Sequence, residues 1–377
     1  MTDLLEEAGR LTELIYDAAL DADQWPLLLK AIASAMDAQG AMLRQVNMQT
    51  GHIGFFETLG YDPVFALAYR EHFHQLDYYQ PHYAAAPVGV LLEADQCVSR
   101  AQRLKSEYFN DYERPQDKVH NIGGVLARDG NETIQFGFHR GMGSEDYTAR
   151  DRRLLQTLLP HLVRAIKIRG MLTTAEYKQE LALGCLDQLR IGVLLLDGCG
   201  RIVYLNREAE KLMSSGFVLA SANDLSLPRP EDTKTLRRLI AMATGRDKAA
   251  GGDMRYSVGT MPCHLWATPL PHDRFSKEFL AASGGVAVFV SREHSPKLPW
   301  QRVAAHYGLT PAEAKLAAAL SEGEDLQAIA ERFSIAYGTA RHQLKSIFAK
   351  TGARRQSELV AMLLQSVLAL CRTEVDE

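Results

Sequence analysis

Apolar residues follow two different periods over the first 170 positions of the chain. Helical spacing is found in three segments, 4–18, 25–36 and 65–73. Short apolar runs typical of strands are found in four segments, 41–46, 53–58, 123–128 and 133–140. The last two runs are separated by Asp129-Gly130-Asn131, which is typical of a hairpin turn. Because helices flank these strands, we expect an α/β (α+β) domain whose sheet is covered by helices on one face.

A stripe of leucine and isoleucine continues at helical spacing between 150 and 170, with arginines and lysines between its members. The stripe consists of Leu154, Leu155, Leu158, Leu159, Leu162, Ile166 and Ile168. Pro160 lies inside it, and because proline lacks an amide proton and clashes one turn back, we expect it to limit any single straight helix. The stripe predicts a helix that closes the first domain, a parallel helix pair that joins two protomers, or both.

Residues 186–292 predict a second small domain of mixed helices and strands. Strands are expected at 191–197, 201–205, 254–258, 263–268 and 285–290. Helices are expected at 207–213, with Asn206 as its N-cap, and at 233–243. The order of these elements, and the segment Leu196-Asp-Gly-Cys-Gly-Arg-Ile-Val-Tyr-Leu-Asn-Arg-Glu-Ala-Glu, resemble a PAS domain. Cys199 lies in the turn and not in the helix where a flavin-reactive cysteine would stand, which argues against a photosensor.

The carboxy-terminal region predicts four helices. Thr310 and Glu313 form a capping box around Pro311, so a helix begins here, and Gly323 follows where it should end. Asp325 caps a second helix, and the turn at 334–336 leads to a third helix over 337–350. A fourth helix begins near Gln356. Two short helices with a tight turn between them are typical of DNA-reading proteins.

Charge is distributed unevenly in this region. The whole chain has 42 basic and 46 acidic residues, a net charge of −4, so any contact with nucleic acid requires a local basic patch. Residues 332–355 hold no aspartate or glutamate. Their cations are Arg332, Arg341, Lys345, Lys350, Arg354 and Arg355. Such segregation favours phosphate binding, although a four-helix bundle with a solvated basic face would also produce it.

The same region resembles the LuxR-type (GerE-like) helix-turn-helix family of bacterial transcription regulators. The matching residues are Leu309, Thr310, Glu313, Gly323, Ile329, Ala330, Ile335, Thr339, Leu344, Ile347, Phe348, Lys350, Gly352 and Arg355. The resemblance implies binding of double-stranded DNA as a homodimer, with Arg341, His342 and Lys345 at base-reading positions. It also implies DNA contacts from Thr339, Lys350, Arg354 and Arg355 and a contact with RNA polymerase. Ala336 replaces the usual serine cap of the recognition helix.

The first 170 residues more loosely resemble the ligand-sensing regions found in front of LuxR-type modules. The resemblance is carried by Tyr108-Phe-Asn-Asp-Tyr-Glu-Arg-Pro and Leu159-Pro-His-Leu-Val-Arg-Ala. The aromatic segment 69–83 is similar to a stretch of acyl-homoserine-lactone receptors but lacks its tryptophan and Asp-Pro spacing. It gives a candidate ligand pocket of Tyr69, Asp77, Tyr78 and Tyr79, with a small-molecule effector as the implied partner.

Other chemistry finds little support in the sequence. The five cysteines are widely spaced and form no CxxC pair, which suits a reducing compartment, and the acidic amino terminus is unlike a secretory signal, so we expect a cytoplasmic protein. His72, His74, Asp77 and His82 are a candidate metal cluster, but the first two point to different faces of a helix. The glycine-containing segments 141–144 and 251–253 lack the flanking strand and helix, in the right order, that a phosphate-binding loop requires. No cofactor motif or catalytic arrangement stands out.

The sequence therefore predicts three domains and no enzyme. They are a ligand-sensing α+β domain over 1–170, a PAS-like domain with a leading helix over 171–292 and, after a linker at 293–300, an all-α four-helix LuxR-type domain over 301–377. Dimerisation is expected through Leu363, Leu364 and Val367 of the last helix, and through the 154–168 stripe. The alternatives are a PAS-based signalling module that acts mainly through protein partners, and an enzyme in the first domain.

Overall fold

The computed structural model describes residues 2–221, 224–244, 250–270, 285–292 and 298–366, and the chain divides into two compact units, 1–178 and 179–377. Each unit contains one five-stranded sheet whose strands are paired antiparallel. The structure is therefore of the mixed α and β class that the sequence predicts. No helix among the described residues is both long and apolar enough to cross a bilayer.

The first sheet has the strand order β2-β1-β5-β4-β3. Its strands are β1 (Gly40–Asn47), β2 (Ile53–Leu59), β3 (Leu91–Glu93), β4 (His120–Asp129) and β5 (Glu132–Arg140). Strands β4 and β5 form the expected hairpin, and Gly130 at its turn has a positive φ of 54°, a conformation that favours glycine. The four strands that the apolar pattern predicts are confirmed, whereas the short strand β3 was not predicted.

Three helices cover one face of this sheet: α1 (Thr2–Leu20), α2 (Trp25–Ala35) and the first half of α7 (Ala149–Asp187). Leu43, Phe136 and Phe138 of the sheet pack against these helices in one hydrophobic core. The leucines of the 154–162 stripe are buried in the same core. The prediction of a helix that closes the first domain is therefore confirmed, and the stripe's leucines are not free to join two protomers.

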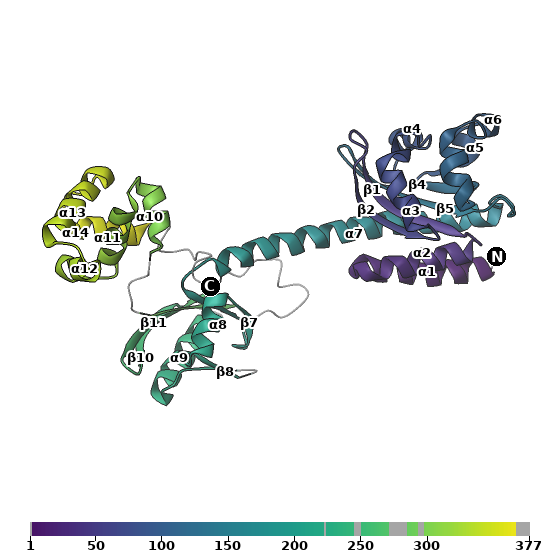
Figure 1. Cartoon of the computed structure of the whole chain (residues 1–377). Helices are drawn as coiled ribbons and strands as arrows, with labels where there is room; N and C mark the ends of the chain where they lie inside the picture. The colour runs from purple at the N-terminus through teal and green to yellow at the C-terminus, as the bar shows by residue number, and fades with distance from the viewer. Residues whose placement is uncertain (1, 222–223, 245–249, 271–284, 293–297, 367–377) are drawn as a thin grey trace. The chain divides into compact units, whose positions relative to one another are not determined.

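The opposite face of the sheet is also covered, so the expectation of a sheet covered on one face only is wrong. Helices α3 (Pro63–Glu71), α4 (Gln80–Ala85), α5 (Ala94–Cys97) and α6 (Arg100–Arg103) lie on this second face, as Figure 1 shows. With a π-helical turn at Tyr108–Glu113 they hold a cluster of buried tyrosines. The predicted helix over 65–73 is α3 of this layer. Tyrosine hydroxyls make the layer partly polar, and for that reason the pattern of apolar residues did not reveal the rest of it.

Pro160 does not interrupt α7, contrary to expectation. Both Pro160 and Gln156, whose carbonyl loses its helical partner, are exposed, so water can solvate that carbonyl. The helix therefore continues to Asp187 as a single element of 39 residues.

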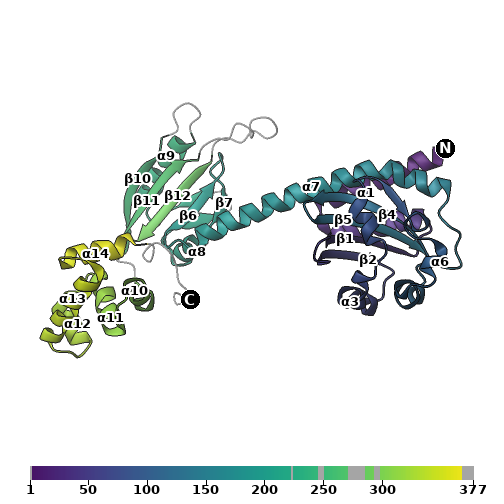
Figure 2. The same ribbon diagram turned by 90° about the horizontal axis from the view of Figure 1, so that it is seen from above.

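The second sheet has the strand order β10-β11-β12-β6-β7, and Figure 2 shows these strands side by side. Its strands are β6 (Gly192–Leu196), β7 (Ile202–Leu205), β10 (Gly252–Val258), β11 (Met261–Pro269) and β12 (Val286–Arg292). Helices α8 (Arg207–Ser214) and α9 (Pro230–Ala243) pack on one face around Leu194, Leu212 and Leu236. The predicted strands and helices are confirmed, and a small additional pair, β8 (Leu219–Ser221) and β9 (Asp224–Ser226), was not predicted.

The described residues from 298 onward are helical and have a core of their own. The helices are α10 (Trp300–Tyr307), α11 (Pro311–Ser321), α12 (Leu326–Arg332), α13 (Tyr337–Thr351) and α14 (Gln356–Gln365). The four helices predicted after residue 309 are confirmed, and α10 precedes them. Leu316, Ile329, Ile347 and Leu359 are fully buried between these helices.

Candidate nucleic-acid interface and candidate ligand cavity

The turn between α12 and α13 is short and well defined. Ser334 has a positive φ of 55°, and the Ile335 amide donates to the Ala330 carbonyl at 3.0 Å. Ile335 is half-buried against the helical core, which fixes the direction in which α13 leaves the turn. Two short helices therefore follow each other through a tight turn, as the spacing of the sequence predicts.

Helix α13 has one buried face and one exposed, cationic face. Ala340, Leu344 and Ile347 are buried in the core of the helical region. Arg341, His342 and Lys345 are exposed, and at 3.6 residues per turn they lie on the opposite side of the helix. We call these three residues the α13 ridge. The helix thus has the amphipathic arrangement that a groove-reading helix requires.

The other cations of 332–355 fall into two groups. Arg332 Nη1 lies 2.7 Å from Glu324 Oε1, and Lys350 Nζ lies 2.7 Å from Glu313 Oε2. Within the described part of the chain, no carboxylate lies within ion-pair distance of Arg341, Lys345, Arg354 or Arg355. The basic segment is therefore less uniform than its sequence suggests, because two of its six charges are already paired.

Glu313 is the centre of a polar network that joins the start of α11 to the second half of α13. Its carboxylate accepts from the Thr310 amide, the Ser346 hydroxyl and the Lys350 ammonium, each at 2.7 Å. Burial opposes the charge, but these hydrogen bonds outweigh it and lower the pKa of Glu313 from 4.5 to about 2. The predicted capping box is confirmed, and Glu313 also fixes the flank of α13.

The remaining predicted DNA contacts lie at the two ends of α13. Thr339 is exposed in its first turn, and no side chain caps the helix at Ala336, as the absence of serine predicts. Arg354 and Arg355 are exposed in the loop between α13 and α14, where Arg355 is the N-cap residue. A free helix start and nearby arginines are features that phosphate oxygens can use.

One of the three residues expected to form a dimerisation surface on the last helix is buried within the chain itself. Leu363 is fully buried in the core of the same helical region, and Leu364 is half-buried. Val367 lies outside the described residues. The expectation that Leu363 joins two protomers is therefore wrong, because its side chain is used within its own fold.

The predicted ligand pocket corresponds to a buried polar layer on the second face of the first sheet. Tyr69, Asp77 and Tyr79 are buried and Tyr78 is half-buried. Asp77 accepts hydrogen bonds from Arg44 Nη2 at 3.1 Å, Tyr69 Oη at 2.5 Å, Gln80 Nε2 at 2.9 Å and the Tyr79 amide at 2.9 Å. The carboxylate of Asp77 is therefore fully used inside the protein, although the residue lines a cavity.

That cavity has a volume of about 20 Å³. Its lining is Met42, Arg44, Tyr61, Tyr69, Asp77, Tyr79, Tyr108, Tyr112, Asn121 and His139. An open pocket of about 330 Å³ shares Tyr69 with this cavity, and His74 and Gln80 also line it. Of the four residues predicted for the ligand pocket, Tyr69, Asp77 and Tyr79 line this cavity and Tyr78 does not. The lining residues that come from the strands were not predicted.

Two polar side chains of this layer were not recognised in the sequence. Burial raises the pKa of Glu113 from 4.5 to about 8, even though Tyr78 donates a hydrogen bond to its carboxylate. Burial and the charges of Lys118 and Arg44 lower the pKa of His139 from 6.5 to about 3. At neutral pH, Glu113 is therefore mainly protonated and His139 is neutral. The one signal available in the sequence was a charged or polar residue inside an otherwise apolar strand, as at Arg44 and His139.

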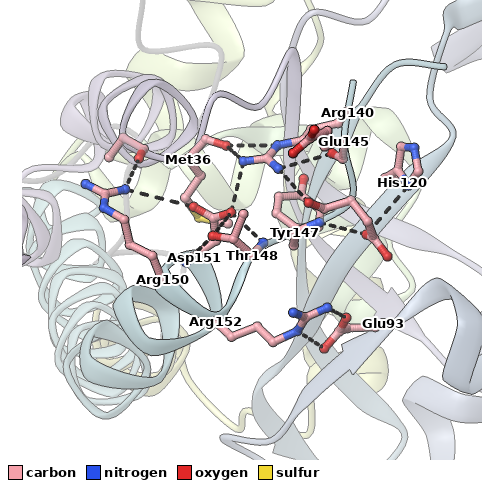
Figure 3. Close-up of polar contacts among 12 residues, drawn as sticks. Met36, Glu93, His120, Arg140, Glu145, Tyr147, Thr148, Arg150, Asp151 and Arg152 are labelled. Atoms are coloured by element: carbon pink, nitrogen blue, oxygen red, sulfur yellow. Dashed lines mark hydrogen bonds and ion pairs between the residues drawn. The ribbon is translucent and has the colours of Figure 1, made fainter. Parts of the chain in front are cut away.

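On the other face of β5, a buried arginine holds the start of α7. Figure 3 shows Arg140 reaching the Met36 carbonyl, the Glu145 carbonyl and the carboxylate of Asp151. The guanidinium also donates to the Asp146 carbonyl at 3.1 Å. Its guanidinium also lies over the Tyr147 ring, 4.4 Å from the centroid. Asp151 accepts from the Thr148 amide at 2.8 Å and so caps the first turn of α7. The first turn of α7 is thereby fixed to β5.

The last turn of α7 is fixed within the second unit. Asn206 is fully buried, and its side-chain amide donates to the carbonyls of Leu186 and Ile191, each at 2.9 Å. Its oxygen accepts from the amides of Val193 and Ala209, so the predicted N-cap of α8 also binds β6. Tyr204 adds a hydrogen bond to Asp187 at 3.1 Å. Helix α7 is therefore anchored by polar contacts at each end.

The candidate metal cluster is not assembled. His72 Nε2 contacts Glu107 at 2.6 Å, and His74 Nδ1 lies 3.3 Å from the Tyr69 carbonyl. Across the described ranges, no group of three or more His, Cys, Asp and Glu side chains is placed to hold a metal ion.

Comparisons with known proteins give distant structural likenesses. No family model matches the chain, and no curated protein matches it. Among solved structures it is similar to the VqsR LBD domain from Pseudomonas aeruginosa, at 18% identity over 44% of this chain and 95% of that chain, with a TM-score of 0.36. It is also similar to Escherichia coli SdiA, at 12% identity over 95% of this chain and 97% of that chain, with a TM-score of 0.32. At these values the likenesses carry no argument about function.

Proposed function

We propose that the protein is a sequence-specific DNA-binding transcription regulator of the LuxR type. It would act as a homodimer, with the 301–377 region as its DNA-binding domain. Residues 1–170 and the PAS-like region 171–292 would sense a small molecule or a protein partner. The observation that carries the proposal is the α13 ridge, because it places exposed cations opposite a buried apolar face directly after a tight turn.

The cations have separate roles in this proposal. Arg341, His342 and Lys345 enter the major groove, where arginine and lysine donate to guanine acceptors. Thr339, Arg354 and Arg355 contact phosphates at the two ends of α13. Lys350 bonds to Glu313, so we assign it first to holding α13 in place and only secondarily to DNA.

The proposal accounts for the polar anchoring of α7. Its first turn is fixed to β5 by Arg140 and its last turn to β6 and α8 by Asn206. A signal changes DNA binding only if it favours one arrangement of the chain over another. Because α7 is fixed at each end, it is a suitable element to transmit a change in arrangement from the first sheet to the second.

A duplex-binding titration at several salt concentrations tests the proposal. The full-length protein should bind duplex DNA with an affinity that falls steeply with salt, because bound phosphates release counterions. Arg341→Ala should weaken binding, whereas Arg153→Ala, which removes the same charge from an exposed position in the first unit, should not. Binding that is insensitive both to salt and to Arg341→Ala would instead favour the alternative, a signalling module that recruits a protein partner.

A further inference from the structure

An open groove of about 1000 Å³ lies beside the core that the first sheet shares with α1, α2 and α7. One wall is α7, through residues between Val163 and Lys178, and the other is the β4–β5 hairpin, through residues between Leu126 and Ile134. All of the lining residues belong to the first unit. None of them lines the two cavities on the second face of the sheet, so the groove is a separate feature.

The lining of the groove is largely apolar, and part of it is open to solvent. Leu126 and Ile166 are buried in the neighbouring core, whereas Met171 is 66% exposed and Val88 is 41% exposed. A Cβ atom at Gly170 would meet no atom within 4 Å, so the surface of α7 is open there as well. Exposed apolar surface in one continuous groove is typical of an interaction site.

The two walls of the groove carry opposite charges. The α7 wall has the exposed side chains of Lys167 and Lys178, and the hairpin wall has Asp129 and Glu132. Within the described residues, neither lysine nor Asp129 has an ion-pair partner. Glu132 accepts hydrogen bonds from the neutral side-chain amides of Gln45 at 3.2 Å and Asn47 at 2.6 Å. Its negative charge is therefore not compensated by a cation.

Arg128 is the remaining charged residue of the lining and lies on the hairpin wall. Its Nη2 donates to the carbonyls of Tyr83 at 2.9 Å and Ala86 at 3.1 Å, so the guanidinium is held at the end of α4. With this arginine counted, the hairpin wall still has one more negative than positive charge, whereas the α7 wall has only positive charges.

This division of charge selects the occupant of the groove. A helix with only acidic residues would be attracted by α7 but repelled by the hairpin, and a basic helix would meet the reverse. A second copy of the chain carries both kinds of wall, and a two-fold axis brings each wall of one copy against the opposite wall of the other. Lys167 of each copy would then lie near the partner's Asp129.

We propose that this groove is the contact surface of a two-fold dimer, in which the α7 wall of one copy packs against the β4–β5 hairpin wall of the other. The apolar lining supplies the surface that is buried, and the charges fix the orientation of the two copies. This inference rests on the homodimer of the proposed function and names the surface that it uses. The surfaces predicted from the sequence do not serve, because the leucines of the 154–162 stripe and Leu363 are buried within the chain.

Gly170→Gln tests the inference by filling the groove. The position is exposed and open, so the variant should fold, and its thermal stability should not fall because glutamine is a better helix former than glycine. In sedimentation of the full-length protein, the Kd of the dimer should rise at least about ten-fold. Gly9→Gln is the matched control, since it makes the same change at an exposed and open position of α1 outside the groove, and it should leave the Kd unchanged. A Kd that Gly170→Gln does not alter would overturn the inference.

Two charge variants test the reciprocal contact. Lys167→Glu combined with Lys178→Glu makes both walls acidic, and Asp129→Lys makes both walls basic, so each protein should associate with itself at least about ten-fold more weakly than wild type. Mixed in equal amounts, the two proteins should form a mixed dimer, because every wall then meets one of opposite charge. Sedimentation with a fluorescent label on one protein detects it. A mixture that does not associate, or self-association of both proteins at wild-type strength, would reject the proposed contact.

These measurements are made without DNA and are thus independent of the regulator proposal. A wild-type dimer that Gly170→Gln does not weaken would reject the groove and keep the homodimer. A monomeric wild type would reject both and would leave the groove to a different protein. Titration of the same preparation with duplex DNA at several salt concentrations then decides on the regulator, whichever of these results is found.

Discussion

Lys350 and Glu313 are separated by 37 residues in the sequence, yet the Lys350 ammonium lies 2.7 Å from a Glu313 carboxylate oxygen. Glu313 stands in the first turn of α11 and Lys350 in the last turn of α13. The pair holds α13 from its flank and leaves the α13 ridge exposed. We therefore expect the Glu313–Lys350 pair, which is not part of the α13 ridge, to influence how accurately the ridge is placed against DNA.

Glu313→Ala should lower the free energy of unfolding of the helical region by about 1–3 kcal/mol, because three hydrogen bonds to a carboxylate are lost. The folded-state pKa of about 2 lies below the usual 4.5, so this stabilisation is fully present above pH 4.5 and is lost as the pH falls towards 2. Denaturant unfolding of wild type and variant at pH 6 and pH 3 measures this change. The exposed Glu331→Ala is the control. A difference between wild type and Glu313→Ala that does not shrink at pH 3 would contradict the assignment.

Lys350→Met and Arg354→Ala should affect different quantities. Arg354 is exposed and only its backbone amide contacts a carboxylate, that of Glu358 at 2.9 Å. Its guanidinium has no ion-pair partner among the described residues, so loss of the side chain should reduce the slope of affinity against salt by about one unit. Lys350→Met should leave that slope nearly unchanged and lower the stability of the helical region instead, because the Lys350 ammonium is paired with the Glu313 carboxylate. Binding isotherms at four salt concentrations, with thermal unfolding of each variant, distinguish the two. The opposite pattern would place Lys350 on the phosphates.

Arg341→Ala and Lys345→Ala should each reduce discrimination between the preferred site and a mutated site by about 1–3 kcal/mol. Their side chains project from the exposed side of α13, whose other side is fixed by Ala340 and Leu344. Competition binding with the two duplexes gives this ratio directly. Were both variants to lose affinity equally for all sequences, the ridge would contact the backbone and not the bases.

Glu113→Gln should remove a pH dependence of the first unit. The pKa of Glu113 is raised to about 8, so the folded state holds a proton that the unfolded chain releases above pH 4.5. The wild-type unit should therefore lose stability as the pH rises from 5 to 8, whereas the neutral amide avoids this loss. Hydrogen exchange of peptides that cover 104–118, measured at pH 6 and pH 8 after correction for intrinsic rates, reports it. Equal pH dependence in both proteins would show that Glu113 is ionised at neutral pH.

Leu363→Ala should destabilise the helical region by about 2–5 kcal/mol, because a fully buried side chain leaves a cavity. Gln365→Ala, at an exposed position on the same helix, is the control and should have little effect. Chemical unfolding followed by circular dichroism measures both. A variant that keeps its stability but changes from dimer to monomer in sedimentation would restore the dimer-contact interpretation of Leu363.

Local signals in the sequence were sufficient for most elements of the fold. The capping box at Thr310 and the N-cap at Asn206 satisfy backbone amides a few residues away, so their chemistry can be read from neighbouring positions. The hairpin at 129–131 is equally local. On the second face of the first sheet only α3 was predicted, from the helical spacing over 65–73. The helices α4, α5 and α6 were missed because they are short and lack a clear apolar period.

The candidate sites show the same division. The α13 ridge follows from the helical period alone, since Arg341 and Lys345 are separated by one turn. The pairing of Lys350 with Glu313 and the surroundings of His139 depend on contacts between distant segments. The sequence carries no signal for the pairing, and for His139 it shows only a polar residue inside an apolar strand. Asp77 was expected to line a ligand pocket and lies at the small cavity, but its four hydrogen bonds inside the protein could not be foreseen.

His139 and Arg140 are consecutive in β5, and the alternation of a strand points them to opposite faces of the sheet. The His139 side chain lines the small cavity on the second face, and the Arg140 guanidinium donates a hydrogen bond to Asp151 in the first turn of α7. A single peptide unit thus connects the two layers of the unit. A displacement of the His139 ring therefore acts on the same stretch of backbone that carries Arg140. Strand β5 thus links the buried cavity to the first turn of α7.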